Sequence, residues 1–299
     1  MRIALITSSD EREFSGAAEL RAAISGLGHD ACEFFVDKAA VRIGSRGVSL
    51  LHIVGRAMAA DASFDAALMR NIGIIRDYEQ FGHRIWTVRA LELSGTCVMN
   101  EISKWIPASD KLATLATLAR AGLPVPETVS SEDLFAGYEA AKEFGSVVVK
   151  PLRSGLGLGV FKLDDPDAAM HIFSYFTSLN KPIYVQGFLE KKGGGDYRVV
   201  VVGGVAVGAE FRKGATWKSS IAQGAVPSKA KLTDELGELA VRAAEAMGLE
   251  FAGVDIAETP DGYFILETNP TIAWAGFRSV TGINPAELIV RHLLDRIKR

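Results

Sequence analysis

A segment near the C-terminus, FAGVDIAETPDGYFILETNP, places three metal-type ligands in an otherwise apolar pattern. It has the pattern of two strands joined by a turn at 259–262. Asp255 lies on the first strand, and Glu267 and Asn269 share one face of the second. Two close carboxylates are costly unless a cation neutralises them, and Mg²⁺ prefers such oxygen ligands. The segment therefore predicts a magnesium site; the alternative is a solvated hairpin face whose acids merely lie close.

The register of this hairpin decides how near the acids come to each other. If Glu258 pairs with Tyr263 across the turn, Asp255 falls opposite Leu266 or Glu267. Both registers bring the two carboxylates and the amide to one patch of sheet.

A second candidate for chemistry is Lys150, which ends an apolar strand, SVVVKP, just before a loop with Gly155, Gly157 and Gly159. The loop lies between two strands, whereas the dinucleotide-binding fingerprint needs a following helix. Backbone N–H groups of such a loop can face phosphate oxygens, and a neighbouring lysine adds a point charge. The alternatives are a plain hairpin turn and a lysine that reaches out to water. Together with the acidic hairpin, the pattern favours a nucleotide site.

Composition narrows the class of protein. The 299 residues are 48% hydrophobic and 23% charged, with a net charge of −3, which is typical of a globular protein. There is no basic tail or stripe, so we expect no nucleic-acid partner. The longest apolar run, Val199 to Ala209, is too short to span a membrane, and we expect no membrane partner. Cys32 and Cys97 lie far apart without a metal or disulfide pattern, which suits the cytoplasm.

The chain divides into three regions that must position these residues. Residues 1–98 have the pattern of an open α/β unit, with 64–95 expected to be mostly helical. Residues 99–184 mix helices and strands, and we expect helices to begin at Ser109 and Ser131. Residues 185–299 are rich in antiparallel strand signals and include an amphipathic helix.

The chain resembles the RimK-type ATP-grasp ligases, which join amino acids, often L-glutamate, to an acceptor carboxylate at the expense of ATP. The matching stretches are, in order, SDKLAT, VVVKPLRSGLGLGV, YVQGFLE, GGDYRVVVVGG, the segment around Arg212, AGVDI and LETNP. The resemblance implies a fold of the α/β and α+β classes. A Rossmann-like pre-ATP-grasp domain (1–98) would precede a central lid subdomain with the glycine loop (99–184) and a C-terminal subdomain with the magnesium site (185–299).

The resemblance also implies roles for individual residues. Lys111 and Lys150 would contact ATP phosphates, and Arg212, with Lys150, would be catalytic and stabilise the transferred phosphoryl group. Asp255, Glu267 and Asn269 would hold Mg²⁺, with Mn²⁺ as an alternative and two ions in all. The remaining cofactor-binding residues would be Ser154, Gly155, Gly157, Gln186, Gly187, Phe188, Leu189, Asp196, Lys218 and Ser220. The backbone of 187–189 would bind the adenine edge, and Asp196 would lie near the adenosine.

The chain departs from the RimK pattern at several positions. Gly187 stands where relatives often have Glu, Lys218-Ser219-Ser220 replaces Arg-Ser-Asn, and Gln223 replaces an Arg. The segment NPTIAWAGFRSVTGI looks more like the tetrahydromethanopterin glutamate ligases and, less closely, the LysX ligases of lysine biosynthesis. We therefore expect the acceptor to be a small cofactor such as tetrahydromethanopterin and the amine to be that of L-glutamate. We also expect the protein to form a homo-oligomer.

The implied reaction has two steps. The acceptor carboxylate attacks the γ-phosphate of ATP to give an acyl phosphate, and the glutamate amine then displaces phosphate to form an amide. Neither step needs an enzyme nucleophile, in keeping with the absence of GxSxG, HExxH and Cys–His patterns. Two alternatives stay open: a ligase that modifies a carrier protein or a peptide terminus, and a non-catalytic nucleotide-binding regulator.

Overall fold

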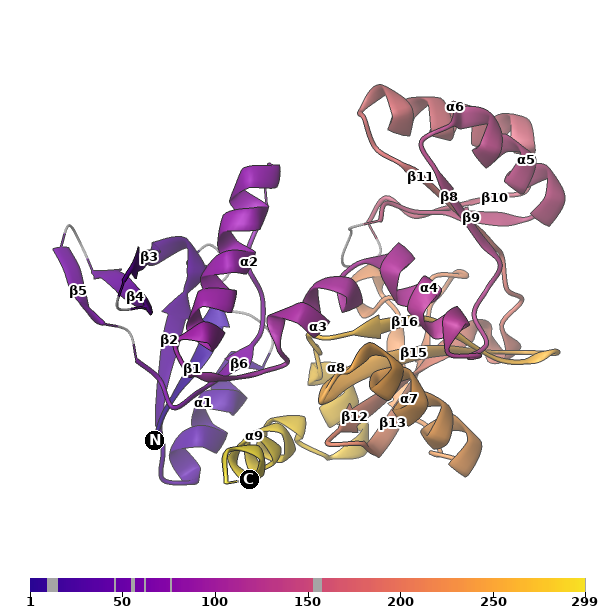
Figure 1. Ribbon diagram of the computed structural model, residues 1–299. Coiled ribbons are helices and arrows are strands. Elements are labelled where there is room, and N and C mark those ends of the chain that lie inside the picture. Colours follow the sequence, from indigo (N-terminus) through magenta and orange to yellow (C-terminus); the bar gives the residue numbers. More distant parts are fainter. Residues whose placement is uncertain are drawn as a thin grey trace.

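The computed structural model describes residues 1–9, 16–45, 47–54, 57–61, 63–75, 77–152 and 158–298. It contains an N-terminal parallel sheet, a small three-stranded sheet, a four-stranded sheet that we call the upper sheet, and a five-stranded sheet that we call the lower sheet (Figure 1). In these ranges no helix is long and apolar enough to cross a membrane.

The N-terminal sheet has the strand order β2-β1-β6-β7 and is parallel throughout. Alternate residues of β1 point to opposite faces of the sheet. Ile3 and Leu5 pack with α1 and α9, while Ala4 and Ile6 pack with α2 and α3. Helices therefore cover both faces, and the strand reads as a continuous apolar run. The elements are β1 (Arg2–Thr7), α1 (Ala17–Gly26), β2 (Asp30–Phe35), β6 (Ala66–Met69), α2 (Tyr78–Leu93), β7 (Cys97–Met99), α3 (Ile102–Ala108) and α9 (Pro285–Ile297).

The expectation that 64–95 is mostly helical was wrong at its beginning. Ala66–Met69 forms β6, whose four residues are all buried between β1 and β7. A short apolar run that is buried on both faces cannot be told from a helix segment by periodicity. The helix begins only at Tyr78, where the Asp77 carboxylate accepts from the N–H of Gln80. A separate antiparallel sheet lies beside this unit and consists of β3 (Ala39–Gly44), β4 (Gly47–Val54) and β5 (Ala57–Asp61).

The upper sheet has the order β10-β9-β11-β8, is antiparallel, and carries α5 and α6 on its outer side (Figure 1). Val149, Phe173 and Ile183 are fully buried between sheet and helices. We expected a helix to begin at Ser131, but Asp133 caps α5 and accepts from two backbone N–H groups. The elements are β8 (Thr128–Ser131), α5 (Leu134–Phe144), β9 (Val147–Val149), β10 (Phe161–Leu163), α6 (Pro166–Ser178) and β11 (Ile183–Gly187).

The lower sheet has the order β14-β13-β12-β15-β16 and is antiparallel. Its apolar face, with Val199, Val201 and Val254, packs under α4 and α7. Asp110 rather than the predicted Ser109 caps α4, because the Asp110 carboxylate accepts from the N–H of Ala113. The elements are α4 (Lys111–Arg120), β12 (Gly195–Val202), β13 (Val205–Lys213), β14 (Val226–Lys229), α7 (Asp234–Met247), β15 (Phe251–Thr259), β16 (Gly262–Asn269) and α8 (Ala275–Thr281).

The hairpin of β15 and β16 confirms the predicted strands and turn. Glu258 pairs with Tyr263, as expected. A bulge between Asp255 and Ile256 then shifts the register, so that Asp255 lies opposite Glu267 rather than Leu266. Of the two registers left open by the sequence, the structure adopts the one that brings the carboxylates together.

Asn100 ties the N-terminal unit to the lower sheet. Its side-chain amide is 1% exposed and donates to the carbonyls of Phe251 and Pro270. Its Oδ1 accepts from the N–H groups of Glu250 and Phe251. One side chain thus satisfies four backbone groups at the start of β15 and the end of β16.

We expect Asn100→Ala to lower the free energy of unfolding by about 3 kcal/mol, because it leaves several buried backbone groups unpaired. Chemical unfolding followed by tryptophan fluorescence would measure the change. Ser178→Ala, which removes one exposed hydrogen bond to the Tyr175 carbonyl, is the control and should cost under about 0.5 kcal/mol. A loss of less than about 1 kcal/mol at Asn100 would contradict the assignment.

Candidate active site

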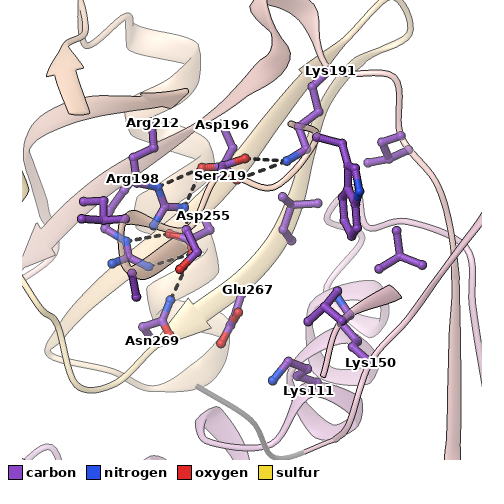
Figure 2. Close-up of a pocket in the computed structure, with 18 of the residues that line it drawn as sticks. Lys111, Lys150, Lys191, Asp196, Arg198, Arg212, Ser219, Asp255, Glu267 and Asn269 are labelled. Carbon is purple, nitrogen blue, oxygen red and sulfur yellow. Dashed lines mark hydrogen bonds and ion pairs between the residues drawn. The ribbon is translucent and has the colours of Figure 1, made fainter. Parts of the chain in front are cut away.

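A cavity of about 620 Å³ opens between the lower sheet, the ends of upper-sheet strands β9 and β11, and the start of α4. Most of the residues singled out from the sequence line it (Figure 2). They are Lys111, Lys150, Gln186, Gly187, Phe188, Leu189, Asp196, Arg212, Ser220, Asp255, Glu267 and Asn269.

The floor of the cavity is the charged face of the lower sheet. Asp196 and Arg198 alternate along β12, and Glu210 and Arg212 alternate along β13, so all four side chains leave the same face. In the antiparallel register Asp196 lies opposite Arg212, and Arg198 lies opposite Glu210. Next to the cavity, the face opposite to α4 and α7 therefore alternates acids and arginines, whereas further along β12 the same face carries Val200 and Val202, which pack with α9.

Asp255 is the centre of this charge network. Arg198 donates to both of its oxygens, from Nε and Nη2, each at 2.8 Å (Figure 2). Arg212 Nη2 approaches Asp255 Oδ2 at 3.1 Å, and Asn269 Nδ2 donates to the same oxygen at 3.4 Å. Burial alone would raise the pKa of Asp255, but the two arginine charges and their hydrogen bonds outweigh it and lower that pKa to about 2. Asp255 is thus an anion at every working pH.

Arg212, predicted to be catalytic, is held by Asp196. Its Nε and Nη2 donate to Asp196 Oδ1 at 2.9 and 2.6 Å. Burial would lower the pKa of the Arg212 guanidinium, but Asp255 and Asp196 raise it well above its usual value. The arrangement gives a fixed, permanently positive group whose orientation is set by a buried acid.

Three lysines line the cavity: Lys111 and Lys150 lie on the side of Glu267, and Lys191 lies beside Asp196 (Figure 2). Lys150 Nζ donates to Gln186 Oε1 at 2.9 Å, and Gln186 donates in turn to Thr128 Oγ1 at 3.0 Å. Burial lowers the pKa of Lys150 to about 8; Glu267 opposes this, whereas the positive charges of Lys111 and Lys191 add to it. Gln186, predicted as a ligand contact, thus serves to position Lys150. The ammonium groups of these lysines suit an anionic ligand.

An aromatic slot forms the remaining wall. Phe188 and Trp217 meet edge to face with centroids 6.0 Å apart, and Lys162 Nζ lies 4.4 Å from the Phe188 ring centroid. The N–H groups of Gly187 and Phe188 already donate to the carbonyls of Glu127 and Ser146. A flat ligand in this slot would therefore have to use other backbone groups of the 187–189 stretch.

Some predicted residues are not among the lining groups. Lys218 does not line the cavity, and its Nζ lies 5.6 Å from the centroid of the Trp217 ring. Ser154, Gly155 and Gly157, the predicted phosphate loop, lie outside the described residues. Ser220 lines the cavity next to Ser219, whose hydroxyl accepts from Lys191 at 2.7 Å.

The sequence reasoning missed three charged residues here: Lys191, Arg198 and Glu210. Lys191 lines the cavity and pairs with Asp196 at 3.4 Å. The sequence does contain a signal for Arg198 and Glu210. The patterns Asp196-x-Arg198 and Glu210-x-Arg212 interrupt apolar strands on either side of the Gly203-Gly204 turn. Alternating opposite charges on two such strands indicate a buried ion-pair face.

The predicted metal ligands come together as expected. Asp255 faces Glu267, and Asn269 reaches the Oδ2 atom of Asp255 across the same strand pair. This set holds only two carboxylates, and no group of three or more His, Cys, Asp or Glu suited to a metal occurs in the described part of the chain. Two carboxylates and an amide oxygen leave room for phosphate oxygens or water in an octahedral shell, so the donors fit Mg²⁺ bound together with a nucleotide.

Comparison with known proteins places this geometry in a family. The RimK-like ATP-grasp domain matches residues 108–293. The tetrahydromethanopterin:alpha-L-glutamate ligase of Methanosarcina acetivorans is 34% identical over 262 residues, which cover 78% of this chain and 80% of that protein. A probable alpha-L-glutamate ligase of Marinomonas sp. is 34% identical over 210 residues, covering 69% of this chain and 70% of that one.

Solved structures show the same fold over nearly the whole chain. The RimK domain protein ATP-grasp from Sphaerobacter thermophilus superposes with a TM-score of 0.73 at 27% identity, covering 98% of this chain and 100% of that one. The ATP-grasp ligase PsnB, solved with a minimal precursor, Mg and ADP, gives a TM-score of 0.73 at 22% identity, covering 99% and 98%. The predicted ATP-grasp fold is confirmed. The chain belongs to the RimK-like ATP-grasp family and is an ATP-dependent ligase.

Proposed function

We propose that this protein uses ATP and Mg²⁺ to join the amine of L-glutamate to the carboxylate of a small acceptor molecule. The observation that carries the proposal is the set of charges that line one cavity: three lysines, the two carboxylates and the amide of Asp255, Glu267 and Asn269, and an arginine fixed by an acid. A nucleoside triphosphate with its metal ion matches this set of charges.

The lysines support binding of the triphosphate. Lys111 and Lys191 line the same cavity as Lys150 and lower its pKa by repulsion, which phosphate oxygens bound among them would relieve. The slot of Phe188 and Trp217 next to them offers aromatic surface for the adenine base. Asp255, Glu267 and Asn269 would hold Mg²⁺, which neutralises charge on the phosphoryl oxygens when bound.

Arg212 supports the transfer step. It is fully charged, rigidly held by Asp196 and directed at the side of Asp255 that faces the cavity. Its free donors can stabilise negative charge on the phosphoryl group and on the acyl phosphate. The described residues provide positioning and charge neutralisation, which is what phosphoryl transfer between two substrates requires.

L-glutamate as the amine, and a small acceptor, are supported by the relatives. The two relatives described above carry glutamate-ligase names, and the Methanosarcina enzyme is named for tetrahydromethanopterin. The peptide-bound structure of PsnB shares the fold at 22% identity, which says nothing about the acceptor of this chain. We therefore propose a pterin-type cofactor or a similar small carboxylic acid, with peptides as the competing class.

ADP release with Mg-ATP and L-glutamate, against a panel of acceptors, tests the function directly. The panel would hold tetrahydromethanopterin-type cofactors, folates, simple carboxylates and a LysW-like carrier protein, with products weighed by mass spectrometry. A glutamate-sized mass gain on a small acceptor is expected. A mass gain on the LysW-like carrier protein alone would favour a ligase that modifies a carrier protein. Absence of ADP release with every acceptor would favour a non-catalytic nucleotide-binding regulator.

We expect Glu267→Gln to reduce turnover at least about a hundredfold while the protein stays folded, because it removes one of two anionic metal ligands. Coupled ADP release measures turnover, and circular dichroism checks the fold. Glu258→Gln is the matched control: this residue lies on the partner strand, pairs with Lys192 and Tyr197, and does not line the cavity. Near-normal ADP production by Glu267→Gln would contradict the metal assignment.

Lys150 predicts how nucleotide binding depends on pH. Its pKa is about 8 in the free protein, and phosphate must raise it, because phosphate favours the charged ammonium. Binding then takes up a proton above about pH 8, and the affinity falls as the pH rises, by at most about tenfold per unit. Below that pH Lys150 is charged in both states and the affinity is flat.

Calorimetric titration of ATP from about pH 7 to about 9.5, in two buffers of different ionisation enthalpy, measures both the affinity and the proton uptake. Lys150→Arg stays charged throughout, so its profile should be flat and its proton uptake absent. An equal slope in this variant would assign the pH dependence to another group.

A further inference from the structure

Glu210 is a buried carboxylate without a visible role. It lies on β13, it is 0% exposed, and neither of its oxygens has a hydrogen-bond partner among the described residues. Burial raises the pKa of its carboxyl, although the charges of Arg198 and Arg212 oppose this. An uncompensated buried acid is costly, so a group that is kept in this state needs an explanation.

Arg198 stands between two carboxylates. In the register of the sheet it lies directly opposite Asp255 on one side and directly opposite Glu210 on the other. Its recorded hydrogen bonds, from Nε and Nη2, go to Asp255. Cross-strand neighbours lie about 5 Å apart, so a change of side-chain rotamer suffices to carry the guanidinium from one acid to the other.

Two basic residues lie directly opposite Glu210 on the neighbouring strands: Arg198 on β12 and Lys229, which is exposed, on β14. A Cβ atom on Gly276 would lie 3.0 Å from Glu210 Oε2 and 2.6 Å from Ile221 Cδ1, so the backbone of α8 packs close to the carboxylate. Arg212 is already held by Asp196 through two hydrogen bonds, which makes Arg198 the half-buried guanidinium that can reach Glu210.

Two of the three acids on this face have cationic partners, and the third has none among the described residues. Arg198 binds Asp255, and both Arg212 and Lys191 pair with Asp196, whereas Glu210 has no hydrogen-bond partner in the described part of the chain. In the structure, Asp255 takes Arg198 and Glu210 is left over. If Asp255 is given to Mg²⁺, as the proposed function requires, Arg198 becomes the unmatched charge next to a second cation, and Glu210 is the acid that remains for it.

We propose that Glu210 is a positioning residue for the metal site: it receives Arg198 when Mg²⁺ occupies Asp255, Glu267 and Asn269. The inference rests on the proposed function, since it assumes that this triad binds the ion. Arg198 thus neutralises Asp255 before the metal binds. When the metal binds, the guanidinium leaves Asp255 on β15 and pairs with Glu210 on β13. The protein keeps a preformed site without an unpaired acid at its centre.

Binding of Mn²⁺ to the ADP-loaded protein, with free Mn²⁺ followed by electron paramagnetic resonance, tests the exchange without relying on catalysis. We expect Glu210→Gln to weaken Mn²⁺ binding about ten- to a hundredfold, as for other residues that support metal ligands. ADP affinity without metal should not change. The metal-free Glu210→Gln protein should be at least as stable to heat as the wild type, because it loses an unpaired buried charge.

A double-mutant cycle separates positioning from a general structural role. In an Arg198→Met background, Glu210→Gln should have no further effect on Mn²⁺ affinity, because there is no guanidinium left to receive. Glu258→Gln, on the same sheet and away from the cavity, is the matched control and should bind Mn²⁺ like the wild type.

Three outcomes would overturn the inference. They are wild-type Mn²⁺ affinity in Glu210→Gln, an equal loss in both backgrounds, and a metal-free Glu210→Gln that is less stable than the wild type or does not fold. Absence of Mn²⁺ binding by the wild-type protein itself would instead overturn the metal assignment of the proposed function, so the two failures are distinguishable.

Discussion

The alternation of side chains along β12 and β13 is the constraint on which the site depends. Val199, Val201 and Ala209 point to α4 and α7, whereas the charged residues share the opposite face with Val200 and Val202, which pack with α9. Because the period of two is rigid, the charged face cannot be moved without exposing the core. The apolar packing that stabilises the lower sheet therefore also fixes Asp196, Arg198, Glu210 and Arg212 relative to one another.

Long-range pairing explains why part of the site could be predicted and part could not. The acidic hairpin is local, because its turn and its alternating pattern depend on residues that are close in the chain. The sequence left open only whether Asp255 lies opposite Leu266 or Glu267, which is a difference of one residue in register. The pair of Arg198 with Asp255 joins residues far apart in the chain, and nothing local shows that β12 and β15 are neighbours. Family resemblance supplied Arg212 and Asp196, but it placed Asp196 near the adenosine and did not indicate the ion pair between the two residues.

Local signals also failed where two of them competed. Ser109 and Asp110 are both good N-caps, as are Ser131 and Asp133, and in each case the structure uses the aspartate, whose charge favours the N-terminus of a helix. The strand Ala66–Met69 was hidden because burial on both faces removes the alternation by which strands are recognised. The lysines show the same limit, since a net charge of −3 gives no hint of a cavity that is lined by three of them.

The tie made by Asn100 has a mechanical consequence. Asn100 forms hydrogen bonds at both ends of the acidic hairpin, and Arg296 of α9 donates to the carbonyl of Val98. The N-terminal unit and the lower sheet are therefore held together as one unit. The elements of the upper sheet pack mainly on one another and join the rest of the chain through two crossings, near Pro124–Pro126 and after Gly187. Opening the cavity thus means bending the chain at these two crossings, which would carry Lys150 with the upper sheet while Trp217, the carboxylates and Arg212 stay with the lower sheet.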